Sequence, residues 1–241
     1  MFVALVNILN TTSDWMIDRR GTRLVFLISG YNNATFDTIA KSNYTGGIVG
    51  CYSAIAGNAS NRMTVKNCTN MAVISALRGF VAGIVGFAKN ATIEDCSYTV
   101  GRITDQVNPH AAGIIGGAYD STIKNCTATI DISTASGGSC DSRGGGIVAI
   151  ASGKTCVENC SYYGKITLTP DTDTDPTEEY VGGIVAYGDE NSIAKDSRYG
   201  GNINGVTISA SNYLAYAIGI GDGNGTIPPI AVSNISYWNG K

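Results

Sequence analysis

The chain has 241 residues and a net charge of −3; only 15% of its residues are charged, whereas 44% are hydrophobic. A soluble domain usually has about 25% charged residues, so hydroxyl and amide groups must cover much of this surface, which argues against a helical enzyme rich in Ala, Glu, Lys and Leu. No cationic run exceeds Arg19 and Arg20, which argues against nucleic acid as a partner, and no apolar run reaches the roughly 20 residues of a membrane-spanning helix.

Residues 1–45 form the first predicted unit, an N-terminal cap or flanking segment. The apolar stretch Met1 to Leu9 lacks a cationic n-region, so we expect no signal peptide there. The pattern favours a short helix over residues 2–9 and a strand over residues 23–28. An atypical segment of this kind is needed at the end of a stack of strands, because the end exposes unpaired strand backbone.

A Gly-Ile-Val-Gly-like tetrapeptide recurs through the second unit, residues 46–241. Copies begin at Gly47, Gly83, Gly113, Gly146, Gly183 and, in a degenerate form, Gly219, at intervals of 36, 30, 33, 37 and 36 residues. A β-prone second block follows each copy, and a third block rich in Ile follows that. Such short segments bury an apolar face only when copies stack. The repeats therefore predict an all-β fold, a parallel β-helix (β-solenoid) with three short strands per coil and about five to six coils of 30–37 residues.

The repeat aligns three columns of structural residues. The tetrapeptide glycines permit a close approach or a positive φ. The second block supplies a column of residues suited to a left-handed turn and an amide ladder, namely Asn67, Asp95, Asn125, Asn159, Lys195 and Asn234. It also supplies the column Cys68, Cys96, Cys126 and Cys160, which we expect to be buried free thiols, with disulfides or a metal site as the alternatives. Outside the column, Cys140 and Cys156 are the pair to test for a bridge.

An aromatic column follows the Cys column by two residues. It runs through Asn70, Tyr98, Ala128, Tyr162, Arg198 and Tyr237, with Tyr163 and Tyr199 adjacent. Aromatic rings on an exposed solenoid face stack well on sugar rings, so Tyr98, Tyr162, Tyr163, Tyr199 and Tyr237 are candidate glycan contacts. Ordinary packing of Tyr within strands is the alternative.

Metal and catalytic sites have weaker support. The acidic insertion containing Asp171, Asp173, Asp175 and Glu178 supplies oxygen ligands of the kind that calcium prefers, but it lacks a turn glycine and Pro176 interrupts it, so a solvated loop is favoured. His110 is the only histidine and follows Pro109 in an expected turn, so no Cys–His dyad is indicated. Glu94 and Glu158 are two coils apart with Lys124 between them, which does not suit a pair of catalytic carboxylates. We expect no catalytic residue and no cofactor.

The repeated tetrapeptide and its (Ile/Val)-x-Asn-Cys block resemble the GLUG-repeat proteins of bacterial surfaces. The resemblance covers residue 46 to about residue 238, although the last two copies lack the Cys. It implies an exported, extracellular stalk or adhesin-like module without catalytic activity, with a host or microbial surface glycan or protein as partner and no membrane insertion. A carbohydrate-binding protein that uses the Tyr column is the alternative, and a polysaccharide lyase or hydrolase is less favoured.

Overall fold

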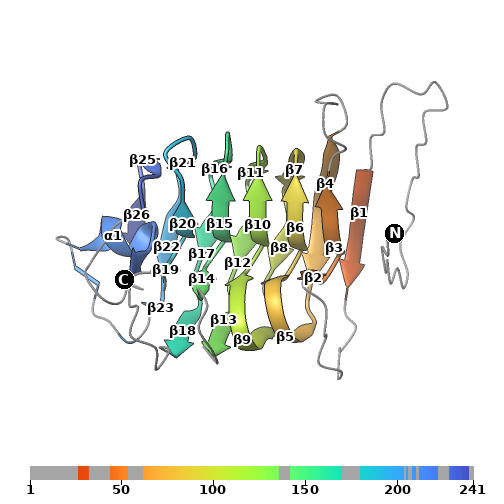
Figure 1. Cartoon of the computed structure of the whole chain (residues 1–241), viewed down its shortest axis with the longest axis horizontal. Helices are drawn as coiled ribbons and strands as arrows, with labels where there is room; N and C mark the ends of the chain where they lie inside the picture. The colour runs from red at the N-terminus through yellow and green to blue at the C-terminus, as the bar shows by residue number, and fades with distance from the viewer. Residues whose placement is uncertain are drawn as a thin grey trace.

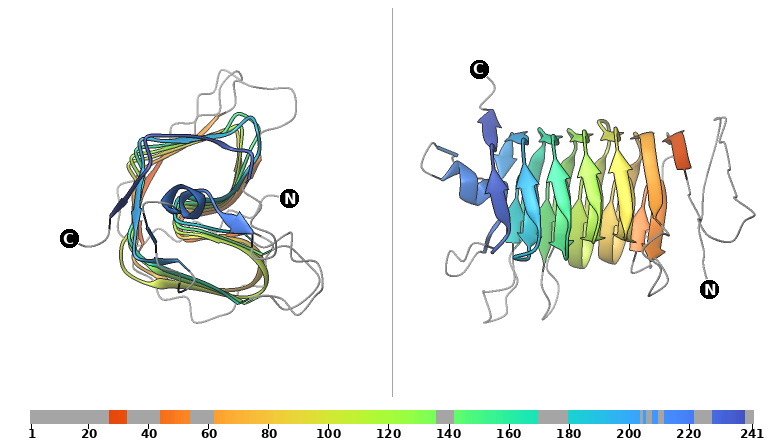
Figure 2. Two further views of the ribbon diagram at one scale, coloured as in Figure 1. Left: turned by 90° about the vertical axis from the view of Figure 1, so that its left-hand side faces the viewer. Right: turned by 90° about the horizontal axis from the view of Figure 1, so that it is seen from above.

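The computed structural model describes residues 27–32, 44–53, 62–135, 142–169, 180–203, 205, 208–209, 212–221 and 228–238. Over these ranges the chain winds into a β-solenoid, and equivalent strands of successive coils pair in parallel (Figure 1). Three sheets, here called A, B and C, run along its length. Seen from the end, the coils superpose on one another (Figure 2). The predicted all-β solenoid is confirmed.

Sheets A and C follow each tetrapeptide. Sheet C stacks β3 (Val49–Ser53), β6 (Val85–Lys89), β10 (Ile115–Tyr119), β15 (Val148–Ser152) and β20 (Val185–Gly188). Sheet A contains β1 (Leu27–Asn32), β4 (Met63–Asn70), β7 (Ala91–Glu94), β8 (Ser97–Tyr98), β11 (Thr122–Lys124), β12 (Thr127–Ala128), β16 (Cys156–Glu158), β17 (Ser161–Tyr162), β21 (Ile193–Lys195), β22 (Arg198–Gly200), β25 (Ala231–Ser233) and β26 (Ser236–Trp238). In most coils the second block thus forms two short strands around a corner.

Sheet B holds the third block and leads into the next tetrapeptide. Its strands are β2 (Tyr44–Gly46), β5 (Val73–Ala82), β9 (Arg102–Ala112), β13 (Asp131–Ala135), β14 (Arg143–Gly145), β18 (Lys165–Thr169), β19 (Tyr180–Gly182), β23 (Asn202–Ile203) and β24 (Ile220–Gly221). In the earlier coils β5 and β9 run unbroken into the tetrapeptide. The three β-prone segments of the repeat therefore map onto the three sheets, as predicted.

Columns of identical or similar apolar residues form the core between the sheets. In sheet B the inward column is Ile74, Ile103, Ile132, Ile166 and Ile203, and all five side chains are buried. Sheet A contributes Val65, Ile93, Ile123, Val157 and Ala194, which are fully buried. β-Branched side chains suit such stacked strands, and burial of these rows is the main contribution to stability.

The two ends of the solenoid differ from its middle. At the first end β1 pairs in parallel with β4, so part of the predicted flanking segment joins sheet A. At the other end the short helix α1 (Tyr213–Ala217) precedes Gly219, and β24 then pairs with β19 in the antiparallel direction. The degenerate sixth copy therefore closes sheet B, whereas sheet A gains β25 and β26 as one more parallel pair of strands. The expected helix over residues 2–9 lies outside the described residues.

Candidate functional site

The corner between the two strands of sheet A is formed by an Asn or Asp in a left-handed conformation. The φ angles of these corner residues are +54° at Asn67, +53° at Asp95, +55° at Asn125, +49° at Asn159, +49° at Asp196 and +49° at Asn234. The predicted column member Lys195 is wrong, because Lys195 pairs with Glu158 and Asp196 takes the corner. Asn and Asp tolerate this backbone conformation better than Lys does, which accounts for the register.

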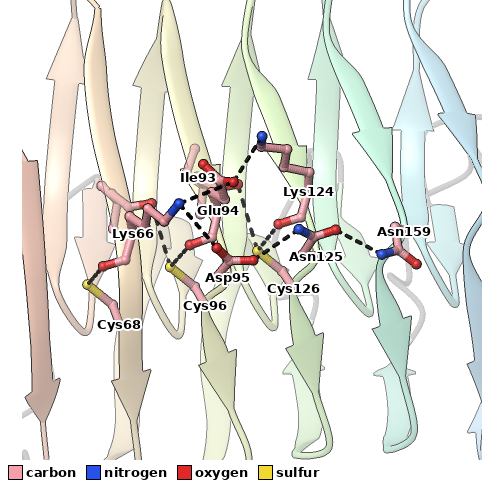
Figure 3. A network of polar contacts seen from close by, with 11 residues as sticks. Lys66, Cys68, Ile93, Glu94, Asp95, Cys96, Lys124, Asn125, Cys126 and Asn159 are labelled. Carbon is pink, nitrogen blue, oxygen red and sulfur yellow. Dashed lines mark hydrogen bonds and ion pairs between the residues drawn. The ribbon is translucent and has the colours of Figure 1, made fainter.

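The corner side chains form an amide ladder on the surface (Figure 3). Asn125 Nδ2 donates to Asp95 Oδ1 at 3.0 Å, and Asn159 Nδ2 donates to Asn125 Oδ1 at 2.8 Å. A second segment joins Asn234 Nδ2 to Asp196 Oδ1 at 2.7 Å. In every bond the later coil donates to the earlier one, so the ladder has a direction. Because Asp has no amide donor, Asp95 and Asp196 each begin a segment.

A row of alternating charges lies beside this ladder. The register of sheet A aligns Lys66, Glu94, Lys124, Glu158 and Lys195. Glu94 Oε1 lies 3.4 Å from Lys66 Nζ and 2.9 Å from Lys124 Nζ, while Glu158 Oε1 lies 3.2 Å from Lys195 Nζ. The hydrogen bond from Lys124 lowers the pKa of Glu94 below its ordinary value. That direction is opposite to the raised pKa of a general acid in glycoside hydrolysis.

We call the outward surface of sheet A, with its charge row and amide ladder, the ladder face. Two rows of small residues complete it. One aligns Thr64, Thr92 and Thr122, and the other aligns Thr69, Ser97, Thr127 and Ser161. Thr69 Oγ1 and Ser97 Oγ are 3.0 Å apart. The ladder face therefore presents hydroxyl, amide and paired charged groups at a regular spacing of about 4.8 Å between strands.

The predicted Cys column is buried directly beneath the amide ladder. Cys68, Cys96, Cys126 and Cys160 are free thiols with at most 1% of their surface exposed, as predicted. Each is within 3.2–3.5 Å of the carbonyl oxygen two residues earlier, to which its thiol donates. Hydrogen bonding with the Cys126 thiol, together with burial, raises the pKa of Cys96 to about 12. The pair Cys140 and Cys156 stays a prediction, because Cys140 lies outside the described residues.

The prediction of glycan contacts is wrong for three of the five candidate Tyr residues. Tyr98, Tyr162 and Tyr199 are fully buried. Their hydroxyls donate to the backbone oxygens of Ala72 and Arg102, of Ile130, and of Tyr213, respectively. The register also places Tyr199, not Arg198, in the column, beside Tyr162 and Tyr237. Tyr163 and Tyr237 are half-buried, and their rings contact Trp238 and Tyr199.

The tetrapeptide glycines explain why these rings are buried. A Cβ on Gly83 would lie 2.2 Å from Tyr98 Cδ1, and a Cβ on Gly146 would lie 2.4 Å from Tyr162 Cγ. The same Cβ on Gly146 would lie 2.0 Å from the carbonyl oxygen of Gly183 in the next coil. Gly83 and Gly146 thus allow close approach of both a ring and the backbone of the next coil. At the other copies a Cβ would meet the Asn70 side chain and Gly83 O from Gly47, Gly146 O and Ala128 Cβ from Gly113, and the Tyr199 ring from Gly183.

The sequence pattern did not predict a row of aromatic and cationic side chains, here called the aromatic seam. Where the end of sheet B turns into sheet C, their outward side chains meet. Phe80 contacts Phe87 and His110 with ring centroids 5.3 Å and 4.8 Å apart, and Arg143 lies 5.0 Å from the centroid of the Tyr187 ring. The missed signal was an aromatic or cationic residue three positions before each tetrapeptide. His110 itself lies in strand β9, so the expected turn is wrong.

The remaining candidate residues give no assembled site. The acidic insertion with Asp171, Asp173, Asp175 and Glu178 lies outside the described residues, so a calcium loop stays a prediction. Across the ranges that the structure describes, no group of three His, Cys, Asp or Glu side chains is placed to hold a metal ion. In those same ranges no helix is long and apolar enough to cross a membrane.

The family model described as the GLUG motif matches residues 108–133. The matched segment runs from the end of β9 through β10, β11 and β12 into β13, and so covers most of one turn of the solenoid. It confirms the GLUG resemblance on one of the repeats from which the resemblance was inferred. No curated protein and no solved structure matches the chain.

Proposed function

We propose that this GLUG-motif solenoid is a non-catalytic structural and adhesive module of an exported bacterial surface protein. Its role is to hold a flat polar surface at a fixed position and to bind a glycan or protein of a host or microbial surface. The ladder face is the observation that carries this proposal. Its strands keep one register over successive coils, and its side chains make polar contacts but form no catalytic arrangement.

The ladder face also supports a rigid module. Backbone hydrogen bonds join each corner to the next coil, as from Asn125 N to Glu158 O at 3.1 Å. The alternating charges add specificity, because pairing that skipped one coil would bring Lys66 against Lys124. Exposed pairs of this kind contribute little net stability, so their main effect is on which coil pairs with which.

The adhesive part of the proposal rests on the composition of this surface. Its four rows present hydroxyls, amides and paired charges, and Tyr98, Tyr162 and Tyr199 of the Tyr column are buried instead of displayed. Polar groups at regular spacing suit recognition of a repetitive polar partner such as a glycan chain, with several weak contacts adding along the solenoid.

Two measurements test the proposal. Antibodies raised against the chain should label intact cells of the source bacterium, and brief protease treatment of those cells should remove the label. Purified chain immobilised on beads should bind host or microbial cells or glycans, and Thr127→Arg on the ladder face should weaken that binding at least fivefold. Ser133→Arg, an exposed position on sheet B, is the matched control.

Some outcomes would overturn the proposal. Label confined to broken cells would contradict the surface location, and equal effects of the two Arg variants would contradict the assignment of the ladder face. Turnover of any member of a panel of neutral and acidic polysaccharides would contradict a non-catalytic role.

A further inference from the structure

The charge row of the ladder face alternates in sign from coil to coil (Figure 3). In the register of sheet A its members are Lys66, Glu94, Lys124, Glu158 and Lys195. The side chain of Glu94 is 18% exposed, and the other four side chains are 31–40% exposed. Each member therefore reaches the surface beside a charge of opposite sign. A row of this kind is complementary to a copy of itself that is displaced by one coil.

The ion pairs within the chain leave this complementarity available. Glu94 binds both Lys66 and Lys124 through the same oxygen, Oε1. A carboxylate has two oxygens with about four acceptor sites, and an ammonium group has three donors. The members of the charge row can therefore pair with their neighbours along the solenoid and with charges of a second surface laid over the ladder face.

Two copies of the chain can bring their ladder faces together about a two-fold axis that runs along the strands of sheet A. This rotation reverses the order of the coils in the second copy. It keeps each row at the same position along the strand, so that charge row lies on charge row and amide ladder lies on amide ladder. The contact is isologous, as is usual in homodimers.

The signs of the charges select one alignment of the two copies. If the charge row were centred on itself, Lys66 would face Lys195 of the second copy, and like charges would meet along the whole contact. After a shift of one coil toward Lys195 the charge row is complementary, but Asp95 of the amide ladder would face Asp196. A shift of one coil toward Lys66 avoids both conflicts, because Asp95 then faces Asn125, a residue that can donate to it.

We propose that the ladder face binds a second copy of this chain in the last of these alignments. Lys66 faces Glu158 of the second copy, and Glu94 faces Lys124, with each pair repeated on the other side of the two-fold axis. The inference rests on the proposed function and deepens it, because it identifies the protein that is bound on a microbial surface as another copy of the chain. Solenoids that project from two cells would meet with their coil orders reversed, as this alignment requires.

The contact is small and polar, which sets its strength. The facing charges span four strands of sheet A, roughly 15 Å from the first to the last. Interfaces that bury less than about 1,200 Å² belong mostly to weak, transient complexes. We therefore expect weak association of single copies, strengthened on cell surfaces by many copies acting together. Because the contact depends on exposed charges, salt should weaken it.

Sedimentation equilibrium of the full chain at concentrations up to about 1 mM tests the proposal. It should show a reversible dimer whose dissociation constant rises at least fivefold in about 0.5 M NaCl. Glu94→Lys and Lys124→Glu should each weaken the dimer at least tenfold, because each brings like charges face to face. An equal mixture of the two variants should form a heterodimer as tight as the dimer of the unmutated chain, since the two changed positions then face each other with opposite signs. Damage within each chain could not be repaired by mixing.

Charge reversals on sheet B are the matched controls. Asp131 and Lys165 are exposed and lie on neighbouring coils, where Asp131 Oδ1 accepts from Lys165 N at 2.9 Å. Asp131 also lies beside Arg102 in the sheet register, so it is an acidic residue between cations, as Glu94 is. Asp131→Lys and Lys165→Glu should leave the dimer unchanged. Circular dichroism of all four variants checks that they remain folded.

The outcomes separate this inference from the proposed function. A chain that stays monomeric at about 1 mM, a mixture that associates no better than either variant alone, or equal weakening by the sheet B variants would overturn self-association through the ladder face. None of these results would affect the labelling of intact cells or the binding of a foreign glycan. A dimer that shows the charge-reversal rescue, from a chain whose antibodies label only broken cells, would support the self-association and contradict the surface location.

Discussion

Replacing Tyr162 tests whether the aromatic column is a core feature or a binding surface. Its side chain is fully buried, and its hydroxyl donates to Ile130 O at 3.1 Å. Tyr162→Phe leaves that carbonyl without its side-chain donor and should cost about 1–2 kcal/mol. Tyr162→Ala removes the ring as well and should cost about 3–5 kcal/mol, as large-to-small aromatic substitutions in cores do. For a chain of this size the corresponding falls in Tm are roughly 2–8 °C and roughly 6–20 °C.

Thermal unfolding followed by far-ultraviolet circular dichroism measures both effects. Val100→Ala is the control, because Val100 is 53% exposed and its truncation should change stability by no more than about 0.5 kcal/mol. Gly146→Ala should still destabilise the chain in the Tyr162→Ala background, because the added Cβ would lie 2.0 Å from Gly183 O even when the ring is absent. If Tyr162→Ala kept the stability of the unmutated chain but lost glycan binding, the burial of this column would be refuted and its interpretation as a sugar-binding surface would be restored.

Three further outcomes follow from contacts inside the coils. A turn glycine follows Tyr98 and Tyr162 in the Tyr column, and a Cβ on Gly101 or Gly164 would lie 2.9 Å or 2.7 Å from the Tyr hydroxyl oxygen. Ala128 holds the same column position, and the buried Ile130 stands where the next coil has Gly164. Ala128→Tyr and Ile130→Gly should therefore each destabilise the fold, while the double variant should recover at least about 1 kcal/mol; additive losses in urea unfolding would contradict this compensation. Among the six thiols that the structure describes, a thiol reagent should label the exposed Cys51 first and Cys96 only on unfolding, and early mass-spectrometric labelling of Cys96 would refute its burial. The pKa of Glu94 is lowered in the folded state. Its ionised carboxylate therefore contributes to the free energy of unfolding above the unfolded pKa of about 4.3, and this contribution is lost as the pH falls below that value. Glu94→Gln should reduce the fall in Tm between pH 6 and pH 3, and an unchanged fall would argue against the pairing with lysine.

Periodicity made the architecture predictable. A tetrapeptide that returns at a steady interval leaves few folds that bury its apolar residues, and the stacked Ile103 and Ile132 show the outcome. The Cys column could be foreseen for the same reason, because small apolar side chains at equivalent positions face the same interior. The corner Asn residues were also predictable, since few residues accept a positive φ.

The direction of side chains in irregular coils was not predictable. Counting two residues from the Cys column put Arg198 where the register has Tyr199, because the block of that coil is displaced by one residue. Since successive side chains of a strand point to opposite faces, that single step exchanges a core residue for a surface residue. Burial of Tyr98 against Gly83 depends on a contact between two sheets, which a pattern along one strand does not contain. The aromatic seam was missed for the same reason.

The axial direction of the hydrogen bonds has a mechanical consequence. Because neighbouring coils are joined by bonds such as Asn125 N to Glu158 O, a pull along the long axis loads these bonds in tension, one interface at a time. The coil that begins at Gly113 has 33 residues before the next tetrapeptide, and a chain gains at most about 3.3–3.6 Å per extended residue. Each coil that peels away would therefore lengthen a tether by roughly 110 Å. A solenoid of this kind can lengthen stepwise under load while its remaining coils stay paired.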